Sequence, residues 1–132
     1  WQHSEKFIPT VIRSLMVGKK IPVYGNGQNI REWIYVDDHN KSILEIADIG
    51  ESGKVYNIGS GEEFTNLAII KIIIESVIGP MHVQNFEDYI EFVEDRKGHD
   101  FRYSLESLQY FREFGLIDFD SGIGKTITHY IK

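Results

Sequence analysis

The sequence predicts a small α/β domain, and three observations support this fold class. Segments with helical periodicity alternate with short segments of strand-like pattern along the whole chain. The composition, with 42% hydrophobic and 26% charged residues, is that of an ordinary globular protein. The 132 residues contain no repeat, low-complexity segment or interdomain linker, and this length allows one hydrophobic core. We therefore expect residues 1–132 to form a single domain.

The predicted elements follow one another in the order α-β-β-α-β-α-β-α-α. Apolar residues three or four positions apart indicate helices, whereas alternating polar and apolar residues indicate strands. A turn that contains Asn26-Gly27 separates the first two strands, which predicts a β-hairpin. The expected helices are 4–20, from Asp37 or Asp38 to about 49, 67–78, 104–114 and from Asp120 or Ser121 to 131; the expected strands lie within 21–38, at 54–58 as a short buried strand and at 89–95, with a loop at 80–89.

Polar residues that commonly cap helices precede most of the predicted helices. These candidate caps are Ser4, Asp37 or Asp38, Thr65 or Asn66, Ser104, and Asp120 or Ser121, and Gly18 marks the expected end of the first helix. The helix at 67–78 is apolar on more than one face, and such a helix is normally covered on two sides. In so short a chain, we expect part of that cover to come from another domain or a partner. The absence of an initiator methionine before Trp1 also suggests a piece of something longer.

The charge distribution favours a small anionic ligand. The net charge of −6 argues against a general nucleic-acid-binding surface, which is typically basic. Residues 1–31 nevertheless contain five basic residues and one acidic residue, which makes a local basic face on an acidic body.

The sequence contains no cysteine, so disulfides and thiolate chemistry are excluded and a reducing cytoplasm is expected. The most apolar stretch, 67–79, is too short to cross a bilayer, and no signal-peptide pattern is recognisable. We therefore expect neither a nucleic acid nor a membrane as a partner.

No motif for metal, covalent or dinucleotide chemistry is present in the sequence. SGIGKT at 121–126 lacks the first glycine of a phosphate loop, because Phe119 occupies that position. YNIGSG at 56–61 lacks the full GxGxxG spacing, and no Tyr-x-x-x-Lys pair occurs. The five histidines lack metal-ligand spacing, and no nucleophile elbow is found. The sequence thus predicts no catalytic residue and no metal site within this chain.

An anion site is one interpretation of the basic residues in two distant segments. VEDRKGHDFRY at 93–103 gathers basic and imidazole side chains on an expected loop. Arginine binds phosphate bidentately, so Arg31 and an arginine of this loop could clamp a diphosphate, while Tyr24 offers a flat face for a base. The cationic candidates are Lys6, Arg31, Arg96, His99 and Arg102. For each residue taken alone, a structural role is favoured: a cross-strand charge pair of Arg31 with Glu32, a core position for Tyr24, and a helix cap for Asn66. The whole segment 93–103 has the alternative interpretation of a solvated charged turn.

Four segments together resemble a known family. EKFIP, IPVYGNGQNIREWIYVDDH, GKVYNIGSGEEFTNL and FVEDRKGHDFRYSL, in this order and spacing, resemble the C-terminal half of the dTDP-glucose 4,6-dehydratases, which are extended short-chain dehydrogenases/reductases. REWIYVDDH and YNIGSG are shared with nucleotide-sugar epimerases and decarboxylases, whereas EKFIP and DRKGHDFRY are narrower signals. The resemblance implies a small mixed α/β substrate-binding lobe of an extended short-chain dehydrogenase/reductase, without the Rossmann half that binds NAD.

The resemblance also implies roles for particular residues. The segment with Glu5 and Lys6 is expected near the sugar and diphosphate, and the segment 22–24 against the base. Arg31 and Asn66 are expected on the diphosphate side, and 95–99 is expected to close on the nucleotide. The implied substrate-binding residues are Glu5, Lys6, Pro22, Val23, Tyr24, Arg31, Asn66, Asp95, Arg96, Lys97, Gly98 and His99.

In this family, bound NAD+ takes a hydride from sugar C4, water is lost across C5–C6, and the hydride returns to C6, which converts dTDP-glucose to dTDP-4-keto-6-deoxyglucose. The resemblance implies that the groups performing these steps precede Trp1, so the chain is not expected to be catalytic alone. The full-length protein is expected to be a homodimer through the missing half. Two alternatives stay open: a fragment of a related nucleotide-sugar epimerase or UDP-sugar dehydratase, and a stand-alone, non-catalytic nucleotide-sugar-binding module.

Overall fold

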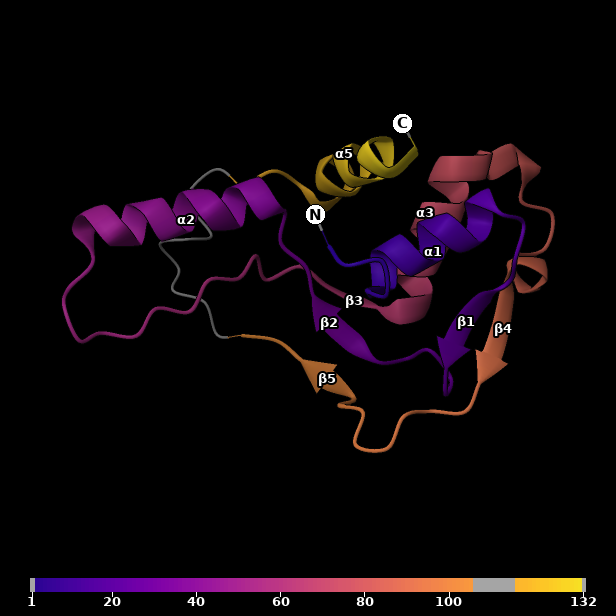
Figure 1. Cartoon of the computed structure of the whole chain (residues 1–132), viewed down its shortest axis with the longest axis horizontal. Helices are drawn as coiled ribbons and strands as arrows, with labels where there is room; N and C mark the ends of the chain where they lie inside the picture. Colours follow the sequence, from indigo (N-terminus) through magenta and orange to yellow (C-terminus); the bar gives the residue numbers. More distant parts are fainter. Residues whose placement is uncertain (1, 106–115, 132) are drawn as a thin grey trace.

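The computed structural model describes residues 2–105 and 116–131. Figure 1 shows α1, α3 and α5 gathered in one body beside two small sheets, while α2 and the loop after it extend away from that body. The elements are the helices α1 (Phe7–Met16), α2 (Val36–Ile49), α3 (Asn66–Ile78) and α5 (Phe119–Ile131), the 3-10 helices η1 (Pro80–His82) and η2 (Phe86–Tyr89), and the strands β1 (Ile21–Tyr24), β2 (Ile30–Glu32), β3 (Glu63–Thr65), β4 (Ile90–Val93) and β5 (Arg102–Tyr103).

The strands form two separate sheets. In one sheet, β1 and β4 run parallel, with Ile21 opposite Ile90 and Tyr24 opposite Val93. In the other, β2 lies in the centre, antiparallel to β3 and parallel to β5. The carboxyl end of β1 and the start of β2 are joined by residues 25–29, so this connection carries the chain from one sheet to the other.

The hydrophobic core lies between the three central helices and the β1–β4 sheet. It is built from aliphatic side chains that are all less than one-tenth exposed: Ile8, Val11 and Ile12 of α1, Ile21 and Val23 of β1, Ile69, Ile70, Ile73 and Ile74 of α3, Ile90 of β4, and Ile123 and Ile127 of α5. Burial of this apolar surface is the main force that holds the body together.

The apolar helix α3 is covered from within the chain. It contacts α1 on one side and α5 on another, which agrees with the expectation that two faces are buried. Ile72, Val77 and Ile78 are also partly buried against the core, and Lys71 and Ser76 are the exposed positions of this helix. The expectation that a further part of its cover comes from another domain or a partner stays a prediction, because Ile72, Val77 and Ile78 are only half-buried.

The predicted hairpin at Asn26-Gly27 is wrong, because β1 and β2 do not pair with each other. The turn itself exists: the Asn26 side chain accepts from the Gln28 amide at 3.0 Å, and the Gly27 amide donates to the Tyr24 carbonyl at 3.1 Å. The end of the turn does not lead into a strand paired with β1. Instead, the Gly27 carbonyl accepts a hydrogen bond from the Leu67 amide of α3 at 3.1 Å. The start of α3 thus holds the turn, and β2 is directed to β3 and β5.

The short buried strand predicted at 54–58 is also wrong. This segment has no partner strand among residues 2–105 and 116–131, and Val55 is 90% exposed. A strand needs a neighbour to satisfy its amides and to cover its apolar face. The sequence at 54–58 shows the alternation of polar and apolar residues that is typical of a strand. It contains no information on whether a neighbouring strand is present. The strand predicted at 89–95 is confirmed as β4, and 80–89 contains η1 and η2 rather than only loop.

The helix caps agree with the sequence in part. Thr65 caps α3 by accepting from the Ala68 amide at 3.1 Å, and Gly18 follows α1 with a φ of 66°. Neither Ser4 nor the Asp37–Asp38 pair is an N-cap, because α1 and α2 begin after Lys6 and Tyr35. At α5 the capping carboxylate belongs to Asp118, which accepts from the Ser121 amide at 2.8 Å, instead of Asp120 or Ser121.

Three further points complete the description of the fold. The buried Asp38 carboxylate accepts from the Ile117 amide at 3.0 Å, which ties the start of α2 to the segment before α5.

The helix predicted at 104–114 falls almost entirely outside the described residues. None of the helices in the described part of the chain has the length and apolar character needed for a membrane span.

Candidate functional site

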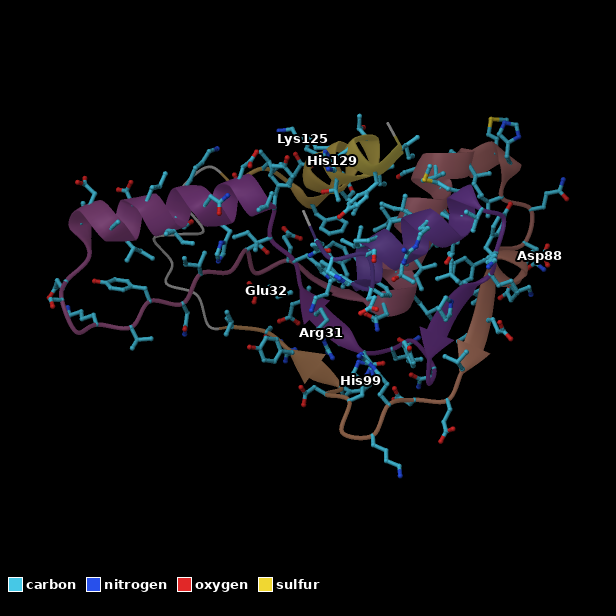
Figure 2. All side chains as sticks on the ribbon, in the orientation of Figure 1. Arg31, Glu32, Asp88, His99, Lys125 and His129 are labelled. Carbon is cyan, nitrogen blue, oxygen red and sulfur yellow. The ribbon has the colours of Figure 1, made fainter. Side chains whose placement is uncertain are left out.

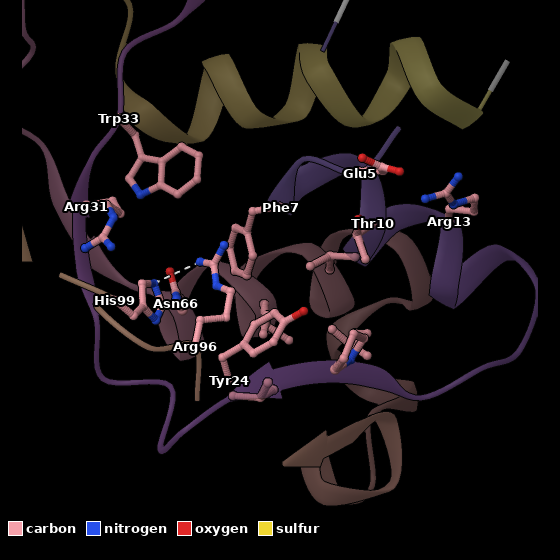
Figure 3. A pocket seen from close by; sticks show the side chains of 15 residues that line it. Glu5, Phe7, Thr10, Arg13, Tyr24, Arg31, Trp33, Asn66, Arg96 and His99 are labelled. Carbon is pink, nitrogen blue, oxygen red and sulfur yellow. Dashed lines mark hydrogen bonds between the residues drawn. The ribbon is translucent and has the colours of Figure 1, made fainter. Parts of the chain in front are cut away.

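A cleft of about 360 Å³ opens between α1, the end of β1, β2 and the loop after β4 (Figure 3). Its polar or charged lining residues are Glu5, Thr10, Arg13, Tyr24, Arg31, Trp33, Asn66, Arg96 and His99, and its apolar ones are Phe7, Val11, Ile21, Pro22, Val23 and Ile70. Three guanidinium groups therefore face one carboxylate in the cleft. This excess of positive charge suits an anionic ligand.

Arg31 is fixed at one end of the cleft by backbone carbonyls. Its Nη2 donates to the Asp100 carbonyl at 2.8 Å, and its Nη1 donates to the Ile30 carbonyl at 2.7 Å. The first of these bonds joins β2 to the loop that precedes β5. An arginine has five N–H groups, so two such bonds leave donors for a ligand while the side chain stays ordered.

Asn66 brings the N-terminus of α3 to the same end of the cleft. The first three amides of α3 are already bonded within the chain, to the Asn29 carbonyl, the Gly27 carbonyl and the Thr65 hydroxyl. An anion here would gain from the positive end of the helix dipole but not from these amides. The side chains of Asn66 and the arginines therefore have to supply the hydrogen bonds.

The loop after β4 contributes Arg96 and His99. The Arg96 guanidinium lies 4.9 Å from the centre of the Tyr24 ring, and its Nη2 is 3.0 Å from His99 Nε2. Residues 96–99 form a tight turn, in which the His99 amide donates to the Arg96 carbonyl at 3.1 Å and Gly98 has a φ of 74°. Such a turn needs a positive φ at its third residue, which explains glycine at that position.

The other end of the cleft is formed by α1 and the residues before it. Thr10 and Arg13 lie three positions apart, so they share one face of α1. The hydroxyl of Thr10 and the guanidinium of Arg13 both donate to the Ser4 carbonyl, at 3.3 and 2.5 Å. Glu5 is exposed beside them, and its Oε2 lies 3.8 Å from His3 Nδ1. A carboxylate at this end repels phosphate and suits ligand hydroxyl groups.

The structure brings eight of the twelve implied binding residues into one cleft. These are Glu5, Pro22, Val23, Tyr24, Arg31, Asn66, Arg96 and His99. Lys6, Lys97 and Gly98 are exposed and do not line it, and Asp95 contacts it through a hydrogen bond to His99. In Figure 2, Arg31 and His99 lie close together although they come from distant parts of the chain.

Sequence reasoning missed seven lining residues: Phe7, Thr10, Val11, Arg13, Ile21, Trp33 and Ile70. The spacing of Thr10 and Arg13 on the first predicted helix was the available signal, because residues three apart on a helix lie side by side. No comparable signal exists for Trp33. Its indole Nε1 is buried and has no hydrogen-bond partner in the described part of the chain.

Two charged residues near the site have structural roles instead. Arg102, a cationic candidate from the same loop, makes two hydrogen bonds to Glu63 of β3, at 2.8 and 3.0 Å. The hydrogen bonds from Arg102 have the largest effect in lowering the pKa of Glu63, and a hydrogen bond from Ser104 lowers it further. Glu32 does not pair with Arg31; its carboxylate accepts from the amides of Gly61 and Leu105 at 2.7 and 2.8 Å.

A second cavity of about 400 Å³ lies between α5 and the start of α2. In this cavity, Lys125 Nζ lies 5.4 Å from the centre of the Tyr35 ring. The pKa of Tyr35 is raised, mainly by burial and to a smaller extent by the nearby Asp37 carboxylate. None of the implied binding residues lines this cavity. The described residues also contain no group of three or more histidine and carboxylate side chains arranged to hold a metal ion.

The described residues do not fit a dinucleotide such as NAD. An NAD-binding turn places glycine amides between a strand and the start of a helix. Here the glycine-containing segments 25–27 and 59–61 lead into the strands β2 and β3. The first amides of α3 are engaged within the chain, as described above.

Comparison with known proteins identifies the chain's relatives. The family described as "NAD dependent epimerase/dehydratase family" matches residues 2–59. The chain is 39% identical to the dTDP-glucose 4,6-dehydratase of Haemophilus influenzae, over 99% of this chain and 41% of that protein. It therefore spans about two-fifths of the length of the curated relatives that it matches.

Solved structures agree with this relationship. The dTDP-glucose 4,6-dehydratase DesIV from Streptomyces venezuelae, solved with NAD and TYD bound, superposes with a TM-score of 0.86 at 36% identity, over 99% of this chain and 40% of that one. The UDP-glucose 4-epimerase of Thermotoga maritima, at 19% identity and a TM-score of 0.78 over 96% of this chain and 39% of that one, shares the fold alone. The predicted fold class is confirmed.

The resemblance seen in the sequence is likewise confirmed, since both the sequence and the fold match dehydratases over nearly the whole chain. The narrower motifs EKFIP and DRKGHDFRY are the part of the sequence that is typical of these enzymes. By sequence and by fold, the chain is similar to the dTDP-glucose 4,6-dehydratases, and its residues 2–59 match the NAD-dependent epimerase/dehydratase family.

Proposed function

We propose that this chain is the nucleotide-sugar-binding part of a dTDP-glucose 4,6-dehydratase and that the cleft holds dTDP-glucose. The observation that carries this proposal is the convergence of Arg31, Asn66 and Arg96 on one end of the cleft. These side chains come from three distant segments and together offer the donors that a diphosphate requires.

The remaining lining residues suit the other parts of a nucleotide sugar. Pro22, Val23 and Tyr24 form an apolar and aromatic wall for the base, next to the diphosphate end. Glu5 stands at the opposite end, where a carboxylate accepts hydrogen bonds from sugar hydroxyl groups. Lys6 and Lys97 lie outside the lining and are assigned a long-range attraction for the ligand, and Gly98 shapes the turn that carries His99.

For the full-length protein, we propose an NAD-dependent lyase that converts dTDP-glucose to dTDP-4-keto-6-deoxyglucose. The relatives exceed this chain in length, and the solved dehydratases contain bound NAD. We assign NAD and the catalytic groups to an N-terminal domain outside this sequence, so the chain alone is expected to be inactive. Homodimer formation through that domain and a cytoplasmic location remain predictions from the sequence.

Calorimetric titration of the folded chain with dTDP-glucose, with UDP-glucose in parallel, tests the proposed ligand. Saturable binding that prefers dTDP-glucose is expected. In Arg31→Ala, loss of the charge-assisted hydrogen bonds should weaken binding roughly 10- to 100-fold. Lys19→Ala is the matched control, because it removes an exposed cation of the same basic segment that does not line the cleft, and it should leave binding nearly unchanged.

The possible outcomes separate the alternatives. Preference for UDP-glucose would favour a UDP-sugar dehydratase or an epimerase. No binding by a demonstrably folded chain would show that this lobe does not recognise the nucleotide sugar alone, which excludes the stand-alone binding module. Equal losses in the Arg31 and Lys19 variants would mean that net charge, and not the cleft, attracts the ligand.

A further inference from the structure

Asp95, Arg96 and His99 form a linear hydrogen-bonded chain at the edge of the cleft. His99 Nδ1 is 2.8 Å from Asp95 Oδ1, and His99 Nε2 is 3.0 Å from Arg96 Nη2. The His99 side chain is only 8% exposed, although it belongs to a loop. Figure 3 shows the Arg96 guanidinium between the His99 ring and the Tyr24 ring.

These contacts fix the tautomer of His99. A guanidinium group has only N–H donors, so His99 Nε2 has to accept the hydrogen bond from Arg96. The ring proton then sits on Nδ1 and is donated to the Asp95 carboxylate. This hydrogen bond is the largest cause that lowers the pKa of Asp95, and the Arg96 amide at 2.8 Å from Asp95 Oδ1 adds to it, against an opposing effect of burial.

Two glycines make room for this arrangement. Gly98 allows the tight turn that brings His99 back toward Arg96. Gly25 faces the Asp95 carboxylate, and a Cβ atom at position 25 would lie 3.0 Å from Asp95 Oδ2. Glycine at positions 25 and 98 thus allows the backbone to accommodate the Asp95–His99 hydrogen bond. This accommodation suggests that the hydrogen bond has a function beyond stabilising the loop.

We propose that His99, held by Asp95 as the neutral Nδ1–H tautomer, is a positioning residue that fixes Arg96 over Tyr24 to receive the diphosphate of the ligand. This inference rests on the proposed function of the cleft. Arg96 is otherwise an exposed, long side chain with many rotamers. Ordering it before the ligand arrives lowers the entropic cost of binding.

Protonation of His99 breaks this contact. Nε2 would then carry a hydrogen directed at the Arg96 guanidinium, so two donors and two cations would face each other. The other charged or titratable groups around the ring are Asp95 on the same loop, Arg31 of β2 and Tyr24 of β1. One carboxylate faces two guanidinium groups, so the neutral imidazole is the form of His99 that can hold Arg96 in position.

A set of variants of the whole chain, titrated with dTDP-glucose, tests the inference. His99→Ala removes the acceptor and should weaken binding about 10-fold, which corresponds to one lost hydrogen bond to a charged group. His99→Gln offers a carbonyl oxygen near the Nε2 position and should restore most of the affinity. In an Arg96→Ala background, His99→Ala should cause no further loss, because its effect passes through Arg96.

The ring spectrum gives a further measurement. Nitrogen-15 spectra of the ligand-free chain at pH 8 should show the proton on Nδ1, and circular dichroism confirms that each variant is folded.

Three results would overturn the inference: a proton on Nε2 in the free chain, an equal loss from His99→Ala with and without Arg96, or unchanged binding by His99→Ala. A chain that binds no dTDP-glucose shows that this lobe does not recognise the nucleotide sugar alone, and the ring spectrum, which needs no ligand, then still decides whether His99 holds Arg96. A chain that binds normally with alanine at position 99 contradicts only this inference.

Discussion

Gly27 shows how a single residue determines the connection between the two sheets. Its φ is 70°, and a Cβ atom at this position would lie 2.6 Å from Leu67 Cγ and 2.7 Å from Val23 Cγ1. We predict that Gly27→Ala destabilises the chain by about 3 kcal/mol. The left-handed backbone contributes about 1–2 kcal/mol of this, and overpacking against the start of α3 contributes the rest. Urea unfolding measures the change.

Gly53→Ala is the matched control for this prediction. Gly53 also has a positive φ, of 82°, but no atom lies within 4 Å of the added Cβ. This variant should lose only the backbone contribution of about 1–2 kcal/mol. Equal losses at both positions would show that the approach of Leu67 and Val23 to the turn is not tight in solution.

Residues that line the cleft could be predicted from the sequence where a residue's chemistry matched a family motif. Arg31, Tyr24 and Arg96 were proposed in this way and line the cleft. Arg102 has the same chemistry as Arg96 and lies six residues later, yet it pairs with Glu63. The turn at 96–99 decides which side chain faces the cleft, and the sequence indicates a turn there without indicating its direction.

At the scale of elements, the N-terminus of α5 makes stability depend on pH. The Asp118 carboxylate accepts from the amide and the hydroxyl of Ser121, both at 2.8 Å. These bonds, the amide first, lower the pKa of Asp118 below its ordinary value of 3.8. A carboxyl group with a lowered pKa in the folded state stabilises the protein above the unfolded value and loses this contribution as the pH falls through the folded value.

We therefore predict that Asp118→Ala lowers the urea midpoint at pH 7, because α5 loses its cap. Asp118→Asn should retain most of the stability at pH 7, since asparagine also caps helices and does not titrate. The advantage of the wild type over Asp118→Asn should shrink as the pH falls below about 4, which urea unfolding at pH 7 and pH 3 measures. A constant difference would mean that Asp118 is not bonded to Ser121 in solution.

The helices and strands were predictable to different degrees. Features that depend on neighbouring residues could be predicted, whereas features that depend on residues far apart in the sequence could not. The cap of α3 by Thr65 is local, and the sequence identified it among two candidates. The partner of β1 is β4, almost seventy residues away, and no local signal at Asn26-Gly27 contains that information. An Asn-Gly turn predicts a change of direction, whereas the pairing depends on which surfaces the helices leave free.

At the scale of the whole molecule, the chain divides into a core-forming body and a projecting arm made of α2 and the loop after it (Figure 1). Apolar residues of this arm are exposed, among them Leu44 at 70% and Val55 at 90%. The strand predicted at 54–58 lies in the arm, where it has apolar alternation but no neighbour among the described residues. Sequence patterns predict what a segment can bury, and only the fold determines whether anything covers it.

This division predicts very different costs for the same substitution in two helices. Ile73 of α3 is fully buried between the central helices, so Ile73→Ala should leave a cavity and cost about 2–5 kcal/mol. Ile43 of α2 is 46% exposed, so Ile43→Ala should cost less than about 1 kcal/mol, because alanine's higher helix propensity offsets part of the lost contact. Urea unfolding of both variants measures the difference. If Ile43→Ala costs as much as Ile73→Ala, α2 is buried in solution by a contact that the isolated fold does not contain, and a dependence of that cost on protein concentration would assign the contact to a second copy of the chain.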